Sequence, residues 1–273
     1  MVKWGRVMKS LLFATSVVLG LAAAQPASAA DLEMPTKAPV VAPFYNWNGF
    51  YIGGNVGAGT SHTDYNSYLS TGALEFTGNY DSSGFFGGGQ IGFNYLVTPQ
   101  WLIGIEADAD WSSISGTSYG CTATGCSSGQ TSINDFGTVR GRVGYVSGNF
   151  LLYGTGGWAW SESGTNRTIN CVGATCATGG TGVASPLVGM AASSSGTQGG
   201  WAAGAGIEYG ILPNLTIRAQ FLHLEFDNIG RSFTYAGFPT AFRSTLANTG
   251  SETFTFGVNY LLNWAPAPSA FRH

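Results

Sequence analysis

The sequence predicts an all-β protein, an antiparallel up-and-down transmembrane β-barrel of about eight strands. Only 25 of the 273 residues are charged, about 9%, whereas a soluble surface usually carries roughly 25–35% charged positions. No stretch after the first 30 residues approaches the roughly 18 consecutive apolar residues of a membrane-spanning helix. Instead, apolar side chains recur at every second position in short segments, which is typical of strands that cross a membrane in a closed barrel.

The first 29 residues are expected to be a secretory signal peptide. Lys3, Arg6 and Lys9 form a basic start, residues 10–24 are almost wholly apolar, and Ala-Ser-Ala at 27–29 provides small residues at the cleavage spacing. The alternative is an N-terminal membrane anchor, but a spanning helix needs about 20 apolar residues.

The rest of the chain is expected to contain one barrel between two extended segments. The predicted organisation is a signal peptide at 1–29, a periplasmic leader at 30–48, a transmembrane β-barrel at 49–262 and a C-terminal periplasmic tail at 263–273. Removal of the signal peptide leaves 8 basic and 14 acidic residues, a net charge of −6. Nucleic acid is therefore not expected as a partner, because phosphate binding needs a basic patch.

Eight segments have nearly the 9–11 residues that cross a bilayer when tilted. The predicted strands are residues 50–61, 84–95, 101–112, 135–145, 150–162, 199–210, 215–226 and 252–262. Three connections of about four or five residues alternate with four long ones, expected to be surface loops at 62–83, 113–134, 163–198 and 227–249. Such an alternation is typical of outer-membrane barrels, whose short turns face the periplasm. The facing of the fifth segment stays undecided, and the seventh loses its alternation in its later half.

Aromatic residues gather beside the short turns, where an interfacial girdle is expected. They are Tyr95, Trp101, Tyr145, Phe150, Tyr209 and Tyr260.

Charged residues in the strands are expected to face the lumen, because an arginine facing lipid at mid-depth costs roughly 2–4 kcal/mol. They form a predicted lumen charge network of Glu106, Asp108, Asp110, Arg140, Arg142, Glu208 and Arg218. Such a network could line a selective pore. A filled interior is favoured instead, because eight strands enclose only enough space for their own side chains. The acids of the third strand would then pair with the arginines of the fourth.

A soluble β-sandwich is the main structural alternative, since it also alternates apolar and polar positions. Its polar faces would meet water and carry many lysines and glutamates. The mature chain instead has a single lysine, Lys37, which precedes the first strand. The edges of a sandwich would therefore lack protective charges.

Three stretches carry a family resemblance. The chain reads Trp-Asn-Gly-Phe-Tyr-Ile-Gly-Gly-Asn-Val-Gly at 47–57, Gly-Gly-Gly-Gln-Ile-Gly-Phe-Asn at 87–94 and Gly-Val-Asn-Tyr at 257–260. It resembles the alphaproteobacterial porin-family outer-membrane proteins, small surface-antigen barrels similar to the OmpA transmembrane domain and the opacity proteins.

This resemblance implies residence in the cell outer membrane of a Gram-negative bacterium, exposed loops and a largely structural role. The implied partners are outer-membrane lipid, lipopolysaccharide and the barrel-assembly machinery, while association into homo-oligomers stays open. One departure is that Leu262 stands where such barrels finish on an aromatic residue. Phe271 in the tail is the alternative for this assembly signal.

The four cysteines form two CxxxxC pairs, Cys121 with Cys126 and Cys171 with Cys176, each inside a predicted loop. In an oxidising compartment, local disulfides are the expected state, although four cysteines permit three pairings. No metal site is expected, because CxxC spacing and supporting histidines are missing.

Two further motifs suggest chemistry that we do not expect. The glycines of 87–92 match the spacing of a dinucleotide-binding loop, but that motif must open a helix, and here it lies in a predicted strand. His223 with Glu225 and a loop serine could form a catalytic triad, but no GxSxG motif is present and His223 falls on the predicted outward face. No cofactor and no enzymatic activity are therefore expected.

The sequence thus favours a non-enzymatic barrel that supports envelope integrity and presents surface loops. A narrow passive channel for ions or small solutes is the alternative. A third hypothesis is ligand binding by loop aromatics, namely Tyr65, Tyr68, Tyr80, Tyr119, Phe233, Tyr235 and Phe238.

Overall fold

The computed structural model describes residues 45–262 except for 70–71, 123–124, 174–185, 187 and 236–237. The predicted signal peptide, the C-terminal tail and most of the predicted leader lie outside these residues. Within the described part, no helix has the length and apolar character needed to cross a membrane.

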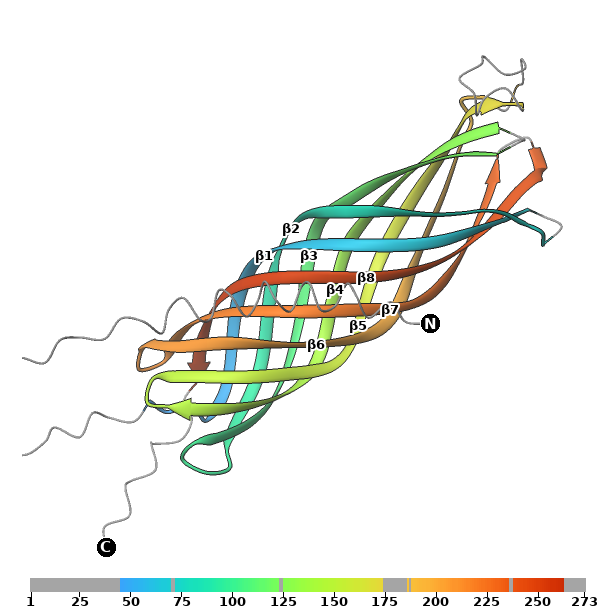
Figure 1. The fold of residues 1–273 in the computed structure, drawn as a ribbon. Coiled ribbons are helices and arrows are strands. Elements are labelled where there is room, and N and C mark those ends of the chain that lie inside the picture. Colours follow the sequence, from blue (N-terminus) through green and yellow to red (C-terminus); the bar gives the residue numbers. More distant parts are fainter. Residues whose placement is uncertain are drawn as a thin grey trace, which may run out of the picture. The chain divides into compact units, whose positions relative to one another are not determined.

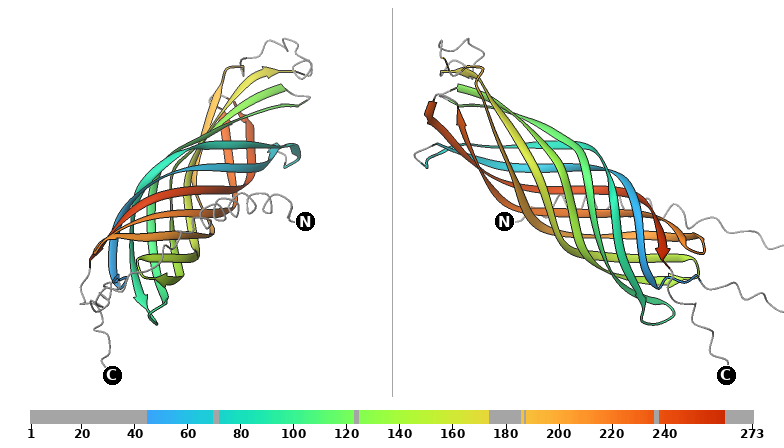
Figure 2. Two further views of the ribbon diagram at one scale, coloured as in Figure 1. Left: turned by 60° about the vertical axis from the view of Figure 1, so that its left-hand side comes forward. Right: turned by 180° about the vertical axis from the view of Figure 1, so that it is seen from behind.

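Eight antiparallel strands follow one another in chain order and close into a barrel (Figures 1 and 2). They are β1 (Gly49–Leu69), β2 (Leu74–Leu96), β3 (Trp101–Thr122), β4 (Gly125–Ser147), β5 (Phe150–Val172), β6 (Ala191–Leu212), β7 (Leu215–Tyr235) and β8 (Phe238–Leu262). The closing pair joins β1 to β8, with Phe50 opposite Leu262. The predicted fold class and strand number are confirmed.

The strands are about twice as long as the sequence predicted, with 21 to 25 residues each. Most of the predicted loop 62–83, for example, is a continuous ladder between β1 and β2. The expectation of four long surface loops is therefore wrong for most of their length. The three short turns lie at one end of the barrel, and the extended hairpins project from the other (Figure 1). We call these the short-turn end and the long-hairpin end.

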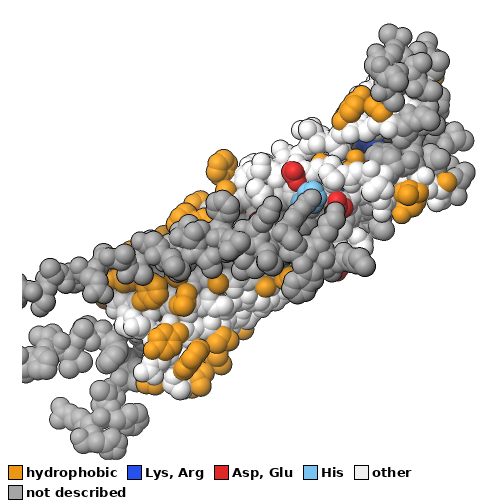
Figure 3. Space-filling view, in the orientation of Figure 1, with side chains coloured by type: hydrophobic (Ala, Val, Ile, Leu, Met, Phe, Trp, Pro, Cys, Tyr) orange, Lys and Arg blue, Asp and Glu red, His pale blue; other side chains and the backbone are white. Residues whose placement is uncertain are grey.

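Most of the exposed large apolar side chains of the outer wall lie in the half of the barrel nearer the short turns, where Figure 3 shows them on one face, while Leu74 and Tyr119 are exposed toward the other end. The six aromatic residues predicted as a girdle are exposed near the short-turn end. A second girdle, which the sequence did not predict, consists of Phe85, Trp111, Trp158 and Trp201. From Trp101 to Trp111, β3 takes ten residue steps of roughly 3.3 Å each at a tilt of about 40°. It therefore rises roughly 25 Å, the height of an outer-membrane apolar band.

Above the second girdle the outward side chains are mostly serine, threonine and asparagine, as at Asn66, Asn79 and Ser115. In water, an outward face needs no apolar residues, so the alternation that marks a lipid-facing strand disappears while the backbone ladder continues. Irregularities of register lie near this boundary, between Ile133 and Asp135 and between Phe226 and Ile229. Such bulges change which side of the sheet a residue faces.

The lumen is filled in layers. At the short-turn end a cluster of buried apolar and aromatic residues closes the mouth: Tyr45, Trp47, Tyr51, Leu102, Val146, Leu151, Tyr153 and Leu261. Above the charged residues lies an apolar layer of Phe86, Ile114, Ile133, Phe136, Ala159, Ala202, Leu222, Leu224 and Phe226. The lumen is therefore polar only over part of its length.

These layers resolve the facings left open by the sequence. In β5, Leu151, Tyr153 and Ala159 face inward, while Leu152 and Trp158 face outward. In the later half of β7 the inward side chains are apolar instead of polar, because Leu222 and Leu224 face the apolar layer of the lumen.

The end of the predicted leader belongs to the barrel. Trp47 is fully buried, and its Nε1 donates a hydrogen bond of 3.1 Å to the carbonyl of Gly148 in the turn between β4 and β5. The Leu96 amide donates to Oδ1 of Asn48 at 2.7 Å. Residues 45–48 are thus packed against the short-turn end rather than extended away from it.

We expect the strand extensions to resist proteolysis, because their backbone groups are paired. Proteinase K applied to the folded protein in detergent micelles should make no cuts in 74–83, whereas boiled protein should be cut there. Mass spectrometry of the fragments gives the cleavage positions. Frequent cuts in 74–83 of the folded protein would mean that this segment is a loop after all.

Candidate functional site

Among the described residues, the buried ion pairs gather in one cluster inside the barrel, above the aromatic closure of the mouth. All seven residues of the predicted lumen charge network are buried there. Six of them are joined by ion pairs, and these carry all the ion pairs between buried side chains of the described residues. We refer to this cluster as the charge layer.

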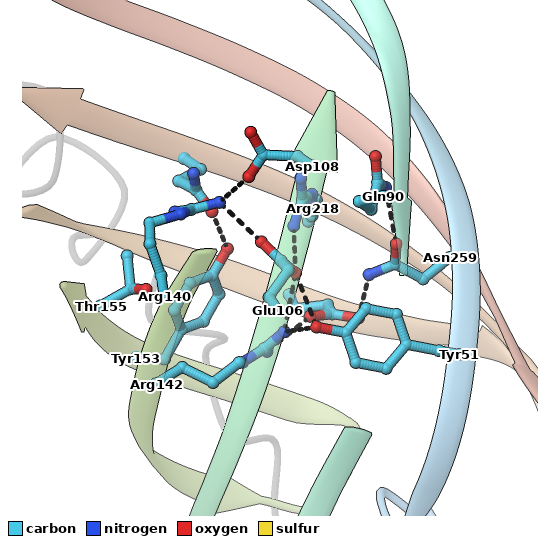
Figure 4. A network of polar contacts seen from close by, with 12 residues as sticks. Tyr51, Gln90, Glu106, Asp108, Arg140, Arg142, Tyr153, Thr155, Arg218 and Asn259 are labelled. Atoms are coloured by element: carbon cyan, nitrogen blue, oxygen red, sulfur yellow. Dashed lines mark hydrogen bonds and ion pairs between the residues drawn. The ribbon is translucent and has the colours of Figure 1, made fainter. Parts of the chain in front are cut away.

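Glu106 lies at the centre of the charge layer (Figure 4). Its Oε1 accepts from Nη2 of Arg140 at 2.8 Å. Its Oε2 accepts from Nη1 of Arg218 at 2.6 Å and from Nη1 of Arg142 at 3.3 Å. The Tyr51 hydroxyl donates to the same oxygen at 2.6 Å. One carboxylate therefore contacts three guanidinium groups from β4 and β7.

Arg140 also links β3 to β4 through a second carboxylate. Its Nη2 lies 2.6 Å from Oδ2 of Asp108, and its Nε donates to the Thr138 hydroxyl at 2.6 Å. Thr138 in turn donates to Oδ2 of Asp108 at 2.6 Å. The register places Glu106 directly opposite Arg140, and Asp108 opposite Thr138.

Arg142 connects this side of the layer to β6. Its Nη2 donates to Oε2 of Glu208 at 2.8 Å, and its guanidinium lies 4.2 Å from the centre of the Tyr153 ring. Oε1 of Glu208 accepts from the Thr216 hydroxyl at 2.5 Å and from Nδ2 of Asn259 at 2.9 Å.

Amide side chains complete the circuit. Nε2 of Gln90 donates to Oδ1 of Asn259 at 2.7 Å, and Nδ2 of Asn55 donates to Oε1 of Gln90 at 3.0 Å. The Tyr153 hydroxyl donates to Oε1 of Gln220 at 2.9 Å. The connected side chains come from all eight strands, so the layer ties the whole circumference together.

Glycines make room for the two tyrosine rings of the layer. A Cβ atom on Gly92 would overlap the Tyr51 ring, and one on Gly206 would overlap the Tyr153 ring. The glycine-rich stretch 87–92 thus lies inside β2, as expected, and at Gly92 it leaves space for a lumen aromatic.

Asp110 is the exception in the predicted set. It is buried beside the layer, yet it forms no ion pair within the described part of the chain, and its Oδ1 has no hydrogen-bond partner there. The arginines therefore satisfy three of the four lumen carboxylates and not this one.

The predicted disulfide between Cys121 and Cys126 is present and bridges the ends of β3 and β4. Cys171 at the end of β5 is also disulfide-bonded. Cys176 lies outside the described residues.

The remaining candidates do not form a site together. His223 lies on the outer wall, with its Nε2 3.6 Å from Oε2 of Glu225 and its ring beside Trp201. Of the proposed loop aromatics, Tyr65 and Phe233 are buried inside the barrel, while Tyr119 is exposed. The side chains of Tyr235 and Phe238 are not among those described.

The charge layer yields a stability prediction. Glu106→Gln leaves three buried guanidiniums short of one carboxylate, and breaking a buried pair typically costs about 3–5 kcal/mol. Asp110→Asn is the matched control, because it removes an equally buried carboxylate that has no ion pair. Urea unfolding in lipid vesicles, followed by tryptophan fluorescence, should show a large loss for Glu106→Gln and little for Asp110→Asn. Equal stabilities would show that the ion pairs contribute nothing.

Two outer-membrane proteins are among the solved structures that align with most of this chain. The outer-membrane protease OmpT of Escherichia coli is 12% identical, with a TM-score of 0.48 over 82% of this chain and 99% of that protein. OprG of Pseudomonas aeruginosa is also 12% identical, with a TM-score of 0.45 over 80% of this chain and 99% of that protein.

Sequence relatives cover most of the chain. The 31 kDa outer-membrane immunogenic protein of Brucella melitensis is 30% identical over 226 residues, which cover 80% of this chain and 87% of the relative. A 22 kDa outer membrane protein of Rhizobium leguminosarum is 29% identical over 194 residues, 70% of each chain. The family model for the outer membrane protein β-barrel domain matches residues 14–261. The chain therefore belongs to the outer-membrane β-barrel protein family and resides in the outer membrane.

Proposed function

We propose that this protein is a non-conducting structural barrel that supports the integrity of the outer membrane and presents a long-hairpin half to the outside. The observation that carries the proposal is the charge layer, in which Glu106 and its arginine partners cross the lumen. Eight strands enclose a space that their own side chains can fill. An ion crossing this layer would have to break charge-assisted hydrogen bonds between buried groups.

Two further barriers support a closed lumen. Trp47 and Tyr45 cover the short-turn mouth, with ring centres 4.7 Å apart. Above the charge layer, Phe86 and Phe136 meet edge to face at 5.1 Å between ring centres. An ion would thus have to cross an aromatic closure, an ion-paired layer and an apolar layer in turn.

A non-enzymatic role is part of the proposal. His223 of β7, the histidine of the catalytic triad that the sequence could offer, lies on the outer wall beside Trp201 of the second girdle. That position suits contact with lipid headgroups, where aromatic side chains gather at the membrane interface. We propose outer-membrane lipid and lipopolysaccharide as the partners of this wall, and the barrel-assembly machinery as the partner during insertion.

Planar-bilayer recording tests the closed lumen. We expect the purified, refolded protein to give no discrete conductance steps, because each barrier is built from packed side chains. The alternative is a narrow passive channel, for which reproducible steps would appear. The Glu106→Gln variant distinguishes lumen current from a contaminating porin. If the ion selectivity of the conductance steps changes in this variant, the ions pass through the lumen, and that result contradicts the proposal.

Deletion of the gene tests the structural role. We expect the deletion strain to become more sensitive to detergents and to large antibiotics that an intact outer membrane excludes. Expression of the wild-type protein should restore resistance. An unchanged sensitivity of the deletion strain would contradict a role in envelope integrity.

A further inference from the structure

The long-hairpin half of the lumen contains a buried arginine of a different kind from those of the charge layer. Arg231 of β7 is only 7% exposed. Its Nη1 donates to the carbonyls of Ser163 at 2.9 Å and Ser194 at 3.0 Å, and its Nη2 donates to the Ser163 hydroxyl. Among the described residues it forms no ion pair, whereas Arg140, Arg142 and Arg218 each contact a carboxylate.

A buried charge without a counter-charge is costly, and proteins normally pair it or bind an ion there. Burial lowers the pKa of Arg231, and the nearby Tyr80 acts in the opposite direction. The carboxylates of the charge layer lie beyond the apolar layer, which includes Ile133 and Phe226. Among the described residues, the partners of this guanidinium are therefore only carbonyl and hydroxyl groups.

Arg231 borders two adjoining cavities of about 40 and 20 Å³. Tyr80, Thr131 and Ala247 line both of them. A water molecule needs a cavity volume of roughly 10–15 Å³, so the two cavities have room for a few waters or for one small ion in place of these waters.

The other groups around these cavities suit an anion. Arg167 of β5 borders the larger cavity, where its guanidinium lies 5.9 Å from the centre of the Phe233 ring. Its Nη1 and Nε donate to the hydroxyls of Ser67 and Ser127 at 3.3 Å each. Hydroxyls of Thr63, Ser82, Thr165, Thr245 and Thr249 line the walls. Hydroxyls can donate hydrogen bonds to an anion, and no described carboxylate lines either cavity to oppose it.

The Arg231 guanidinium has donors left for such a ligand. Of its five N–H groups, three are used by the serine carbonyls and hydroxyl, and Nε makes no hydrogen bond to a described residue. Arginine recognises tetrahedral oxyanions through pairs of N–H donors. We propose that this chamber binds a small inorganic oxyanion, phosphate or sulfate, with Arg231 as its main charged ligand.

Isothermal titration calorimetry on the mature chain, folded in detergent micelles, tests the site. Sodium sulfate and sodium phosphate are the probes, and sodium gluconate keeps the ionic strength constant because its anion is too large for the cavities. We expect saturable binding of one anion per barrel. Arg231→Gln should weaken binding by about tenfold or more, since it removes charge-assisted hydrogen bonds. The absence of saturable binding to the wild-type protein would overturn the proposal.

Two further variants locate the site. Arg140→Gln is the matched control, because it removes a buried lumen arginine on the other side of the apolar layer and should leave the affinity unchanged. Ala247→Leu keeps Arg231 but fills the shared wall of both cavities, so it should abolish binding. Heat-modifiable gel migration reports whether each variant is folded. If Arg231→Gln does not fold, the Ala247→Leu variant decides, and binding retained by that variant overturns the proposal. Weakening by Arg140→Gln equal to that by Arg231→Gln also overturns it.

Discussion

The structure depends on one constraint, that every backbone N–H and C=O in the hydrocarbon must be paired within the protein. Pairing of β1 with β8 along their length, from Phe50 opposite Leu262, meets this constraint by removing both edges of the sheet. Closure with only eight strands leaves a lumen about as wide as the side chains that enter it. Every inward residue must therefore pack against others, and the layers of the lumen follow from which side chains each strand contributes.

The charge layer is better explained by register than by stability alone. Replacing a buried ion pair with apolar residues is often neutral or stabilising, so ion pairs are a poor way to maximise stability. A slip of one residue in a strand, however, moves its side chains to the opposite face. Such a slip of β4 would place Arg140 and Arg142 in lipid and would leave Glu106 without two of its three arginines. The charge layer thus makes wrong strand registers unfavourable for two reasons, the exposure of arginines to lipid and the loss of ion pairs in the lumen.

Alternation was sufficient to predict the strand number, the barrel and the inward facing of residues such as Glu106 and Arg218, because lipid forces that pattern. It failed where lipid no longer acts. Beyond Trp111 the outward residues are polar, so real strands looked like loops. Leu222 and Leu224 look lipid-facing by composition but fill the lumen. The prolines before residue 45 favour an extended leader up to Asn48, although Tyr45, Trp47 and Tyr51 lie at even intervals, a spacing that indicates an inward row of aromatic side chains.

The five arginines whose side chains the structure describes are all buried in the lumen: Arg140, Arg142, Arg167, Arg218 and Arg231. For the arginines between the two girdles, the bilayer explains the inward facing, since an outward charge would meet hydrocarbon. Arg231 lies above the second girdle, where the outer wall meets water and carries exposed acids such as Asp64 and Asp81. An outward arginine at this height would be solvated at little cost. Lipid therefore does not account for its burial, whereas inside the lumen its guanidinium donates hydrogen bonds to the carbonyls of Ser163 and Ser194 and so links β7 to β5 and β6.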